Sequence, residues 1–120
     1  MIQNRQKSPV IERLKNLFYL PGEIALLKSE ISKLQKATDQ SWGEIINIET
    51  KRLNKCIEEM RVSMDLIDGV EDPILRQVLT LHFAVGLGWR QIAFEMGGSY
   101  AAYKQMVYRW AQKPEVNINA

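Results

Sequence analysis

The chain has 120 residues, of which 46% are hydrophobic and 25% are charged. This length and composition fit one folded domain or one small domain with an extension, and they exclude a disordered or fibrous chain and disfavour a multi-domain enzyme. The net charge of +2 is too small to indicate a nucleic-acid partner by itself. A single cysteine excludes an internal disulfide framework, and no segment approaches the roughly 20 apolar residues that span a bilayer, so we expect a cytoplasmic protein without a membrane segment.

Two helices are expected near the N-terminus. Ser8 followed by Pro9 is typical of a helix start, because proline lacks the N–H that would have no partner in the first turn. We expect a short helix over residues 9–19 that ends near Pro21 and Gly22, and a second helix over residues 23–36. The apolar residues of the second helix recur in steps of three and four, as in a coiled-coil seam: Ile24, Leu27, Ile31 and Leu34.

A long third helix follows a break at residues 38–40. Ser41 and Glu44 have the spacing of a capping box, in which each side chain bonds the backbone N–H of the other. We expect this helix to end at Gly69 in a left-handed cap, with Val70 in apolar contact with the helix. One buried stripe is predicted along it, made of Ile46, Leu53, Met60 and Ile67 with Ile57 and Met64 in the adjacent row.

Shorter helices are expected in the C-terminal third. Asp72 and Pro73 predict a new start, and the helix runs over residues 73–85 to Gly86. A brief helix over residues 89–96, a glycine turn and a final helix over residues 100–112 follow. Because no stretch alternates as a strand does, the fold class is all-α: an N-terminal helical hairpin or coiled-coil-like region, then a tri-helical helix-turn-helix unit. The predicted division is 1–70 for assembly, 71–113 for the helix-turn-helix domain and 114–120 for a frayed tail.

The helix-turn-helix prediction depends on small and turn-forming residues at fixed offsets. Ala93 is small where two helices would cross, Gly97 can adopt the positive φ of the turn, and Ser99 can cap the following helix. Residues 73–113 also carry five basic side chains and one acidic one, a surplus of four positive charges. Together these features favour a DNA-binding unit.

The run DPILRQVLTLHFAVGLGWRQIAFEMGGSYAAYKQMVYRWAQK resembles region four of bacterial sigma factors. It is more similar to small phage-encoded transcriptional regulators of Gram-positive hosts, related to the late-gene and autolysin regulators. In that family a D-P-x-x-R-x-V-L-x-L helix leads into G-L-S-W-x-x-I-A-x-x-M-G-x-S and a recognition helix. This chain has Gly88 where the family has serine, and Tyr103 where it has a β-branched residue, so the Tyr103 ring must fit between the helices or tilt outward. The resemblance implies a sequence-specific DNA-binding regulator of phage or prophage origin.

If the final helix reads DNA, its outward residues divide by role. Gln105 can pair with adenine, Lys104 with guanine or phosphate, and Ala101 can touch a thymine methyl. The predicted DNA-contacting set is Arg90, Gln91, Tyr100, Ala101, Lys104, Gln105, Tyr108, Arg109 and Lys113, with Arg90, Gln91, Arg109 and Lys113 assigned to phosphates. The alternative is that these side chains form an ordinary solvated helix face.

No pattern in the chain predicts catalysis, a metal site or a cofactor. His82 and Cys56 are the only residues of their kinds and lie on different predicted helices, which disfavours a metal site or a Cys–His pair. The sequence contains no phosphate loop, nucleophile elbow or dinucleotide fingerprint. We therefore expect a protein that is not an enzyme and binds no cofactor.

The expected partners are double-stranded DNA and a second copy of the chain. A homodimer would read two half-sites, since one such unit contacts too few base pairs for specificity. The helical seams could equally close within one chain. A rival hypothesis is a protein-binding module that inhibits or redirects a host protein such as RNA polymerase or a defence nuclease, and a third is a DNA-packaging subunit.

Overall fold

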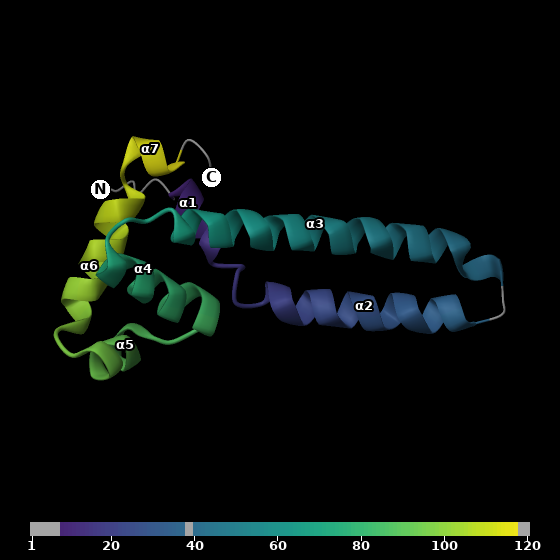
Figure 1. Cartoon of the computed structure of the whole chain (residues 1–120), viewed down its shortest axis with the longest axis horizontal. Helices are drawn as coiled ribbons and strands as arrows, with labels where there is room; N and C mark the ends of the chain where they lie inside the picture. Colours follow the sequence, from purple (N-terminus) through teal and green to yellow (C-terminus); the bar gives the residue numbers. More distant parts are fainter. Residues whose placement is uncertain (1–7, 38–39, 118–120) are drawn as a thin grey trace, which may run out of the picture. The chain divides into compact units, whose positions relative to one another are not determined.

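The computed structural model describes residues 8–37 and 40–117. Throughout these residues the regular elements are helices and no strand occurs, which confirms the all-α prediction (Figure 1). None of the described helices combines the length and the apolar character that a membrane crossing requires. The chain divides into two units, which we call the hairpin unit (residues 19–62) and the larger unit (the described residues up to 18 and from 63 onward). The predicted division at residue 70 is therefore not where the contacts separate.

Helix α1 is shorter than predicted. It spans Pro9–Leu14, and the Ser8 hydroxyl caps it by accepting from the backbone N–H of Ile11 at 3.4 Å. The chain leaves the helix after Leu14, and α2 begins at Leu20 rather than at residue 23. The predicted break at Pro21 is wrong because proline is tolerated in the first turn of α2, where no intrahelical bond is lost.

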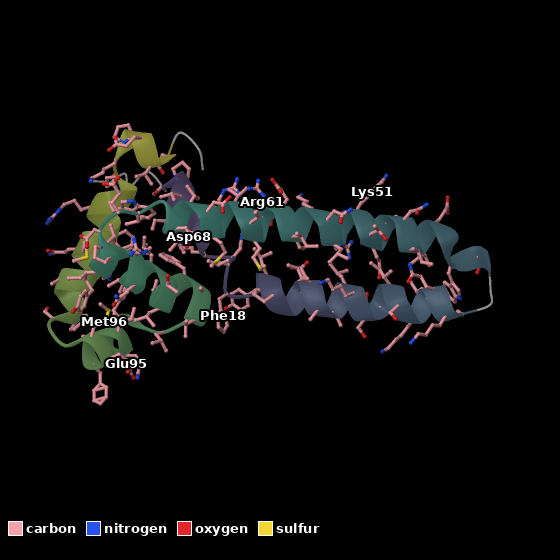
Figure 2. All side chains as sticks on the ribbon, viewed as in Figure 1. Phe18, Lys51, Arg61, Asp68, Glu95 and Met96 are labelled. Carbon is pink, nitrogen blue, oxygen red and sulfur yellow. The ribbon has the colours of Figure 1, made fainter. Side chains whose placement is uncertain are left out.

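The hairpin unit consists of α2 (Leu20–Lys36), a 3-10 turn at Gln40–Trp42 and α3 (Gly43–Asp68) as far as residue 62. In Figure 1, α2 and α3 run side by side, and Figure 2 shows Lys51 and Arg61 pointing away from α2. The α2 seam is confirmed, since Ile24, Leu27 and Ile31 are buried. The core of the hairpin unit consists of the buried residues Leu20, Ile24, Leu27 and Cys56, and the partly buried Leu53 and Met60 pack against them.

The predicted stripe on α3 is wrong at one row. Cys56 is 6% exposed and Ser63 is 1% exposed, whereas Ile57 is 39% exposed. Leu53, Cys56 and Met60, of which Cys56 is buried and the other two are partly buried, follow steps of three and four, and Ser63, in the larger unit, continues the same row. This is the seam of a coiled coil, and it selects positions by geometry even when a smaller or polar residue occupies them.

The junction between α3 and α4 differs from the prediction at Gly69. Of the described glycines, only Gly86, Gly97 and Gly98 have positive φ, so Gly69 does not form the expected left-handed cap. Its N–H instead continues the helical pattern and donates to the Asp65 carbonyl at 3.0 Å. Val70 is buried as expected, and its carbonyl accepts from Arg76 Nη1 at 2.6 Å. The end of the helix is therefore held by a side chain from α4.

The remainder of the larger unit is a set of short helices. Asp72 caps α4 (Pro73–Leu79) by accepting from the N–H groups of Ile74 and Leu75, as predicted. The predicted single helix over 73–85 continues as a π-helical segment, η2 (Thr80–Val85), which ends at Gly86 with φ 91°. Helices α5 (Trp89–Met96) and α6 (Tyr100–Ala111) follow. The fully enclosed residues are Val10, Leu14, Val78, Leu79, Ile92, Val107 and Ala111.

Residues 114–117 are helical where a frayed tail was predicted over 114–120, and the rest of that range lies outside the described residues. Residues Pro114–Asn117 form the short helix α7. The Asn117 Oδ1 accepts from the N–H of Val10 and from the Ser8 hydroxyl, both at 3.1 Å, and its Nδ2 donates to the Ala111 carbonyl at 2.7 Å. The Ser8 hydroxyl also lies 3.0 Å from the same Ala111 carbonyl. We call these contacts the Asn117 clasp, because they join the start of α1 to the end of α6.

Candidate nucleic-acid interface

Helices α5 and α6 pack against each other, α5 also contacts η2, and α6 also contacts α4. Ile92 of α5 and Val107 of α6 are fully buried, and Ala93 is half-buried beside them. Between the helices, Gly97 has φ 79° and Gly98 has φ 104°, and the Ser99 side chain accepts from the N–H of Ala102 at 3.4 Å. The glycine turn and the serine cap thus have the local conformations that the sequence predicts.

Tyr103 folds back over the glycine turn. Its hydroxyl donates to the Gly97 carbonyl, and a Cβ on Gly98 would lie 3.3 Å from the same hydroxyl oxygen. The ring is half-buried, so it neither wedges the two helices apart nor points freely outward. The bulky departure from the family pattern is therefore accommodated by the small residues of the turn.

The predicted DNA-contacting residues of α6 are exposed, but they do not share one face of the helix. Val107, Trp110 and Ala111 form the buried side of the helix. All the predicted contact residues on α6 are exposed: Tyr100, Ala101, Lys104, Gln105, Tyr108 and Arg109. Tyr100 lies seven residues before Val107 and Lys104 lies seven before Ala111, so these two share the buried side of the helix and are exposed only near its start, whereas Ala101, Gln105, Tyr108 and Arg109 lie on the other side.

A hollow of about 300 Å³ brings four of the predicted residues together. Arg90, Gln91, Tyr100 and Lys104 line it, together with Gly88 and Trp89. We call it the α5–α6 hollow. The Arg90 guanidinium carbon lies 4.8 Å from the centre of the Tyr100 ring, a cation–π contact that holds this charge at the start of α6. Gln91 Nε2 donates to Glu95 Oε1 at 3.0 Å along α5.

The first turn of α5 is open to an anion. Gly88 is the N-cap, and no side chain accepts from the first N–H groups of the helix. Unpaired N–H groups at a helix start carry partial positive charge and bind phosphate oxygens well. With Arg90 and Lys104 beside them, the α5–α6 hollow concentrates positive potential at one place.

The other predicted residues lie outside this hollow. Ala101, Gln105 and Arg109 are exposed further along α6, and the Tyr108 ring centre is 6.4 Å from that of Trp89. Lys113 follows the end of α6 and lines a different hollow. The predicted set therefore includes one clustered group and several residues spread along the helix.

Trp89 is a feature of this region that the sequence analysis missed. Its ring stacks on His82 with ring centres 3.8 Å apart, and His82 Nδ1 lies 2.7 Å from the Leu87 carbonyl, to which it must donate. Burial lowers the pKa of His82 from its usual 6.5, and the bond to Leu87 partly offsets this. Spacing along the sequence could not pair His82 with Trp89, because the π-helical segment η2 departs from the 3.6-residue period.

The described residues contain no candidate metal site, and comparison with known proteins identifies no relative. Within residues 8–37 and 40–117 no group of three or more His, Cys, Asp or Glu side chains is placed to hold a metal ion. Comparison of the chain with protein-family models, with curated proteins and with solved structures gives no match.

Proposed function

We propose that this protein is a sequence-specific DNA-binding regulator of transcription, of phage or prophage origin, that reads DNA with α6. The observation that carries the proposal is the α5–α6 hollow, where Arg90, Lys104 and the first N–H groups of α5 converge next to an exposed helix face. The surplus of four positive charges in residues 73–113 supports a polyanionic ligand.

In this proposal phosphates are held at both ends of α6. Arg90, Gln91 and the start of α5 hold one phosphate, and Arg109 and Lys113 hold another. A helix of the length of α6 extends about 17 Å, enough for its two ends to reach the backbones on either side of a major groove about 12 Å wide. These contacts fix the position of α6 but supply no sequence information.

Sequence is then read by the side chains between the two ends. Gln105 pairs with adenine through its amide, Lys104 donates to guanine, and Ala101 contacts a thymine methyl. Tyr100 and Tyr108 flank this row with exposed rings, at 43% and 42%. Each good base contact contributes about 1–3 kcal/mol of discrimination against the wrong base.

In this proposal the hairpin unit forms the interface of a homodimer. Its exposed apolar side chains include Leu26, Ile45, Ile48 and Ile57. Burying them against a second copy would remove apolar surface from water and place two copies of α6 for two half-sites. The proposed regulator is therefore a homodimer that binds DNA with dyad symmetry.

Selection from random duplex DNA tests the proposal. The experiment is run at two salt concentrations, and the mass of the complex is recorded. We expect an enriched motif with dyad symmetry and two chains in the complex. Lys104→Ala and Gln105→Ala should relax the preference at single positions, whereas Arg109→Ala should weaken binding to all sequences and reduce the salt slope by about one.

A matched control is Lys51→Ala, which removes an exposed charge that points away from α2 in the hairpin unit (Figure 2). This variant should bind the selected motif as the unmodified protein does. The proposal fails if no motif is enriched, or if Lys104→Ala, Gln105→Ala and Arg109→Ala all bind DNA with unchanged affinity and preference.

A further inference from the structure

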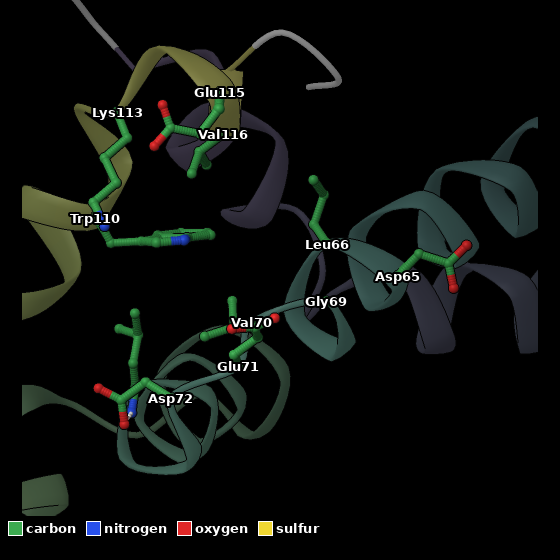
Figure 3. A pocket seen from close by; sticks show the side chains of 11 residues that line it. Asp65, Leu66, Gly69, Val70, Glu71, Asp72, Trp110, Lys113, Glu115 and Val116 are labelled. Carbon is green, nitrogen blue, oxygen red and sulfur yellow. Dashed lines mark hydrogen bonds between the residues drawn. The ribbon is translucent and has the colours of Figure 1, made fainter.

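A second hollow, of about 620 Å³, lies in the larger unit. The end of α3, the linker to α4, the end of α6 and α7 form its walls (Figure 3). We call it the α6–α7 hollow. It shares only Lys113 with the predicted DNA-contacting set.

The interior of the α6–α7 hollow is apolar. Figure 3 shows the Trp110 ring reaching into it from α6, with Leu66 facing from α3 and Val116 from α7. Val70 and Leu75 complete the apolar lining. Such a surface gains free energy when a second apolar group covers it.

Trp110 also carries an unused donor. The residue is only 8% exposed, yet its indole N–H donates to no acceptor among the residues that the structure describes. Its nitrogen is not among the enclosed side-chain atoms that lack a partner, so the N–H is a donor open to a ligand rather than a buried group left unsatisfied. A ligand that supplies a carbonyl oxygen inside the hollow would satisfy it.

The rim of the hollow is acidic. Glu71, Asp72 and Glu115 line it against one cation, Lys113, while the Asp65 carboxylate points away in Figure 3. Asp72 is already engaged as the cap of α4. Glu71 and Glu115 are exposed, and neither forms an ion pair with any other described residue. Both carboxylates are therefore available to a cationic ligand.

We propose that the α6–α7 hollow docks a basic, apolar peptide segment of a partner protein. A main-chain carbonyl of the segment accepts from the Trp110 indole, a lysine or arginine lies between Glu71 and Glu115, and an apolar side chain covers Val70 and Val116. A peptide combines all three groups on one short backbone. Phosphate-bearing ligands are disfavoured by the same carboxylates.

The docking surface shares one residue, Lys113, with the proposed DNA contacts. It uses the end of α6 and α7, whereas the α5–α6 hollow uses the starts of α5 and α6. A regulator that binds DNA on one face and a protein segment on another can connect the two. The proposal also stands if this chain binds no DNA.

Titration of the full-length protein with defined peptides tests the docking surface. The probe is a short peptide of alternating lysine and leucine with blocked ends, and the control probe has glutamate in place of lysine. Binding is followed through the indole N–H resonance of Trp110 in a proton–nitrogen correlation spectrum. We expect the lysine peptide to shift this resonance saturably and the glutamate peptide to leave it in place.

Variants then separate docking from general attraction between charges. The double variant Glu71→Lys, Glu115→Lys should lower the affinity for the lysine peptide by about tenfold or more, because two attractive contacts become repulsive. Trp110→Phe keeps an aromatic ring but removes both the donor and the reporter resonance, so its binding is measured by calorimetric titration. This variant should bind the lysine peptide about fivefold more weakly, the loss of one net hydrogen bond. Glu44→Lys reverses an exposed charge in the hairpin unit and should change nothing.

Three results would overturn the proposal. They are an unshifted Trp110 resonance at saturating lysine peptide, equal binding by the two peptides, and unchanged binding in the Glu71 and Glu115 double variant. The spectra of the variants report whether each remains folded. DNA selection with the double variant distinguishes this proposal from the previous one, because the enriched motif should be unchanged.

Discussion

The larger unit encloses its core, and the hairpin unit does not. Seven residues of the larger unit are 0% exposed, while the most buried residues of the hairpin core, Leu20 and Leu27, are each 4% exposed. Two helices can bury only the stripe along which they touch, whereas several short helices surround a side chain from all directions. The larger unit can therefore hold side chains at fixed positions, and the hairpin unit retains exposed apolar side chains.

Three helix starts of the larger unit have side-chain caps, whereas α5 in the same unit and α2 in the hairpin unit have none. Side chains of Ser8, Asp72 and Ser99 cap the starts of α1, α4 and α6 in the larger unit. The start of α2 in the hairpin unit has Tyr19 as its N-cap, with no side-chain cap bond. Each such cap contributes about 1 kcal/mol, so the larger unit is stabilised at its ends as well as in its core.

Matched leucine truncations test this comparison and should have the largest effect. Leu79→Ala, at a fully enclosed position, should lower the free energy of unfolding by about 3–4 kcal/mol, and Leu27→Ala by about 2 kcal/mol, because a cavity at the hairpin seam can collapse or fill with water. Circular dichroism follows the urea unfolding of the helices in both units together. Tryptophan fluorescence in a Trp42→Phe background follows the larger unit through Trp89 and Trp110.

In that background Leu27→Ala should shift the circular dichroism transition and leave the fluorescence transition nearly in place. Equal shifts of both signals by both variants would contradict the comparison, since they would mean that the two units share one cooperative core.

The Asn117 clasp should give the next largest effect. Asn117→Ala removes the acceptor of the Val10 N–H and the donor to the Ala111 carbonyl, leaving part-buried backbone groups without partners. We expect the free energy of unfolding to fall by about 1–3 kcal/mol, measured by urea titration. Asn54→Ala, at an exposed position of α3, is the control and should change it by less than about 0.5 kcal/mol. Equal values for the two variants would mean that the clasp contributes nothing.

The clasp also shows where sequence reasoning reaches its limit. Ser8, Asp72 and Ser99 were predictable as caps, because a cap bonds a backbone group two or three residues away. Asn117 acts across more than 100 residues, on Val10, and no local pattern encodes that contact. A residue after a helix-ending proline reads as a tail until the fold brings it to its partner.

The long helix α3 shows a second limit. Apolar residues at Ile46, Leu53, Met60 and Ile67 predicted the correct helix, but the choice between Cys56 and Ile57 for the adjacent row followed hydrophobicity rather than geometry. Burial on a helix pair is set by the angle at which the partner helix lies, which one helix alone cannot fix. On α6 the predicted contact residues are all exposed, although Tyr100 and Lys104 share the buried side of the helix with Val107 and Ala111. Sequence reasoning missed the stacking of Trp89 on His82, since η2 is not an α-helix.

Acid should weaken the larger unit through His82. Burial lowers the pKa of this imidazole in the folded state from its usual 6.5, so the unfolded chain binds the proton more readily. Stability is therefore complete above pH 6.5 and is lost as the pH falls below it. His82 is the only histidine of the chain, and His82→Gln should remove this dependence from the fluorescence transition in the Trp42→Phe background. If His82→Gln loses as much stability below pH 6.5 as the unmodified protein does, the effect belongs to other groups.

Acid should have the opposite effect on the hairpin unit through Glu49. Burial first, and then the neighbouring carboxylate of Glu30, raise the pKa of Glu49 from its usual 4.5, and Arg52 offsets this only in part. The folded state therefore holds the proton more tightly than the unfolded chain does. The stability that this group contributes is complete below pH 4.5 and is lost as the pH rises through the raised value.

Glu49→Gln should consequently stabilise the hairpin unit at neutral pH, because it keeps the neutral form at that position, and the gain should disappear below pH 4.5. Thermal unfolding by circular dichroism at pH 7 and pH 4 measures the difference. Glu44→Gln replaces an exposed carboxylate near the start of the same helix and should give no such gain. A neutral-pH gain in both variants, or in neither, would show that Glu49 is not strained by its surroundings. A gain confined to Glu49→Gln would mean that the charged form of this carboxylate, beside Glu30, destabilises the hairpin unit at neutral pH.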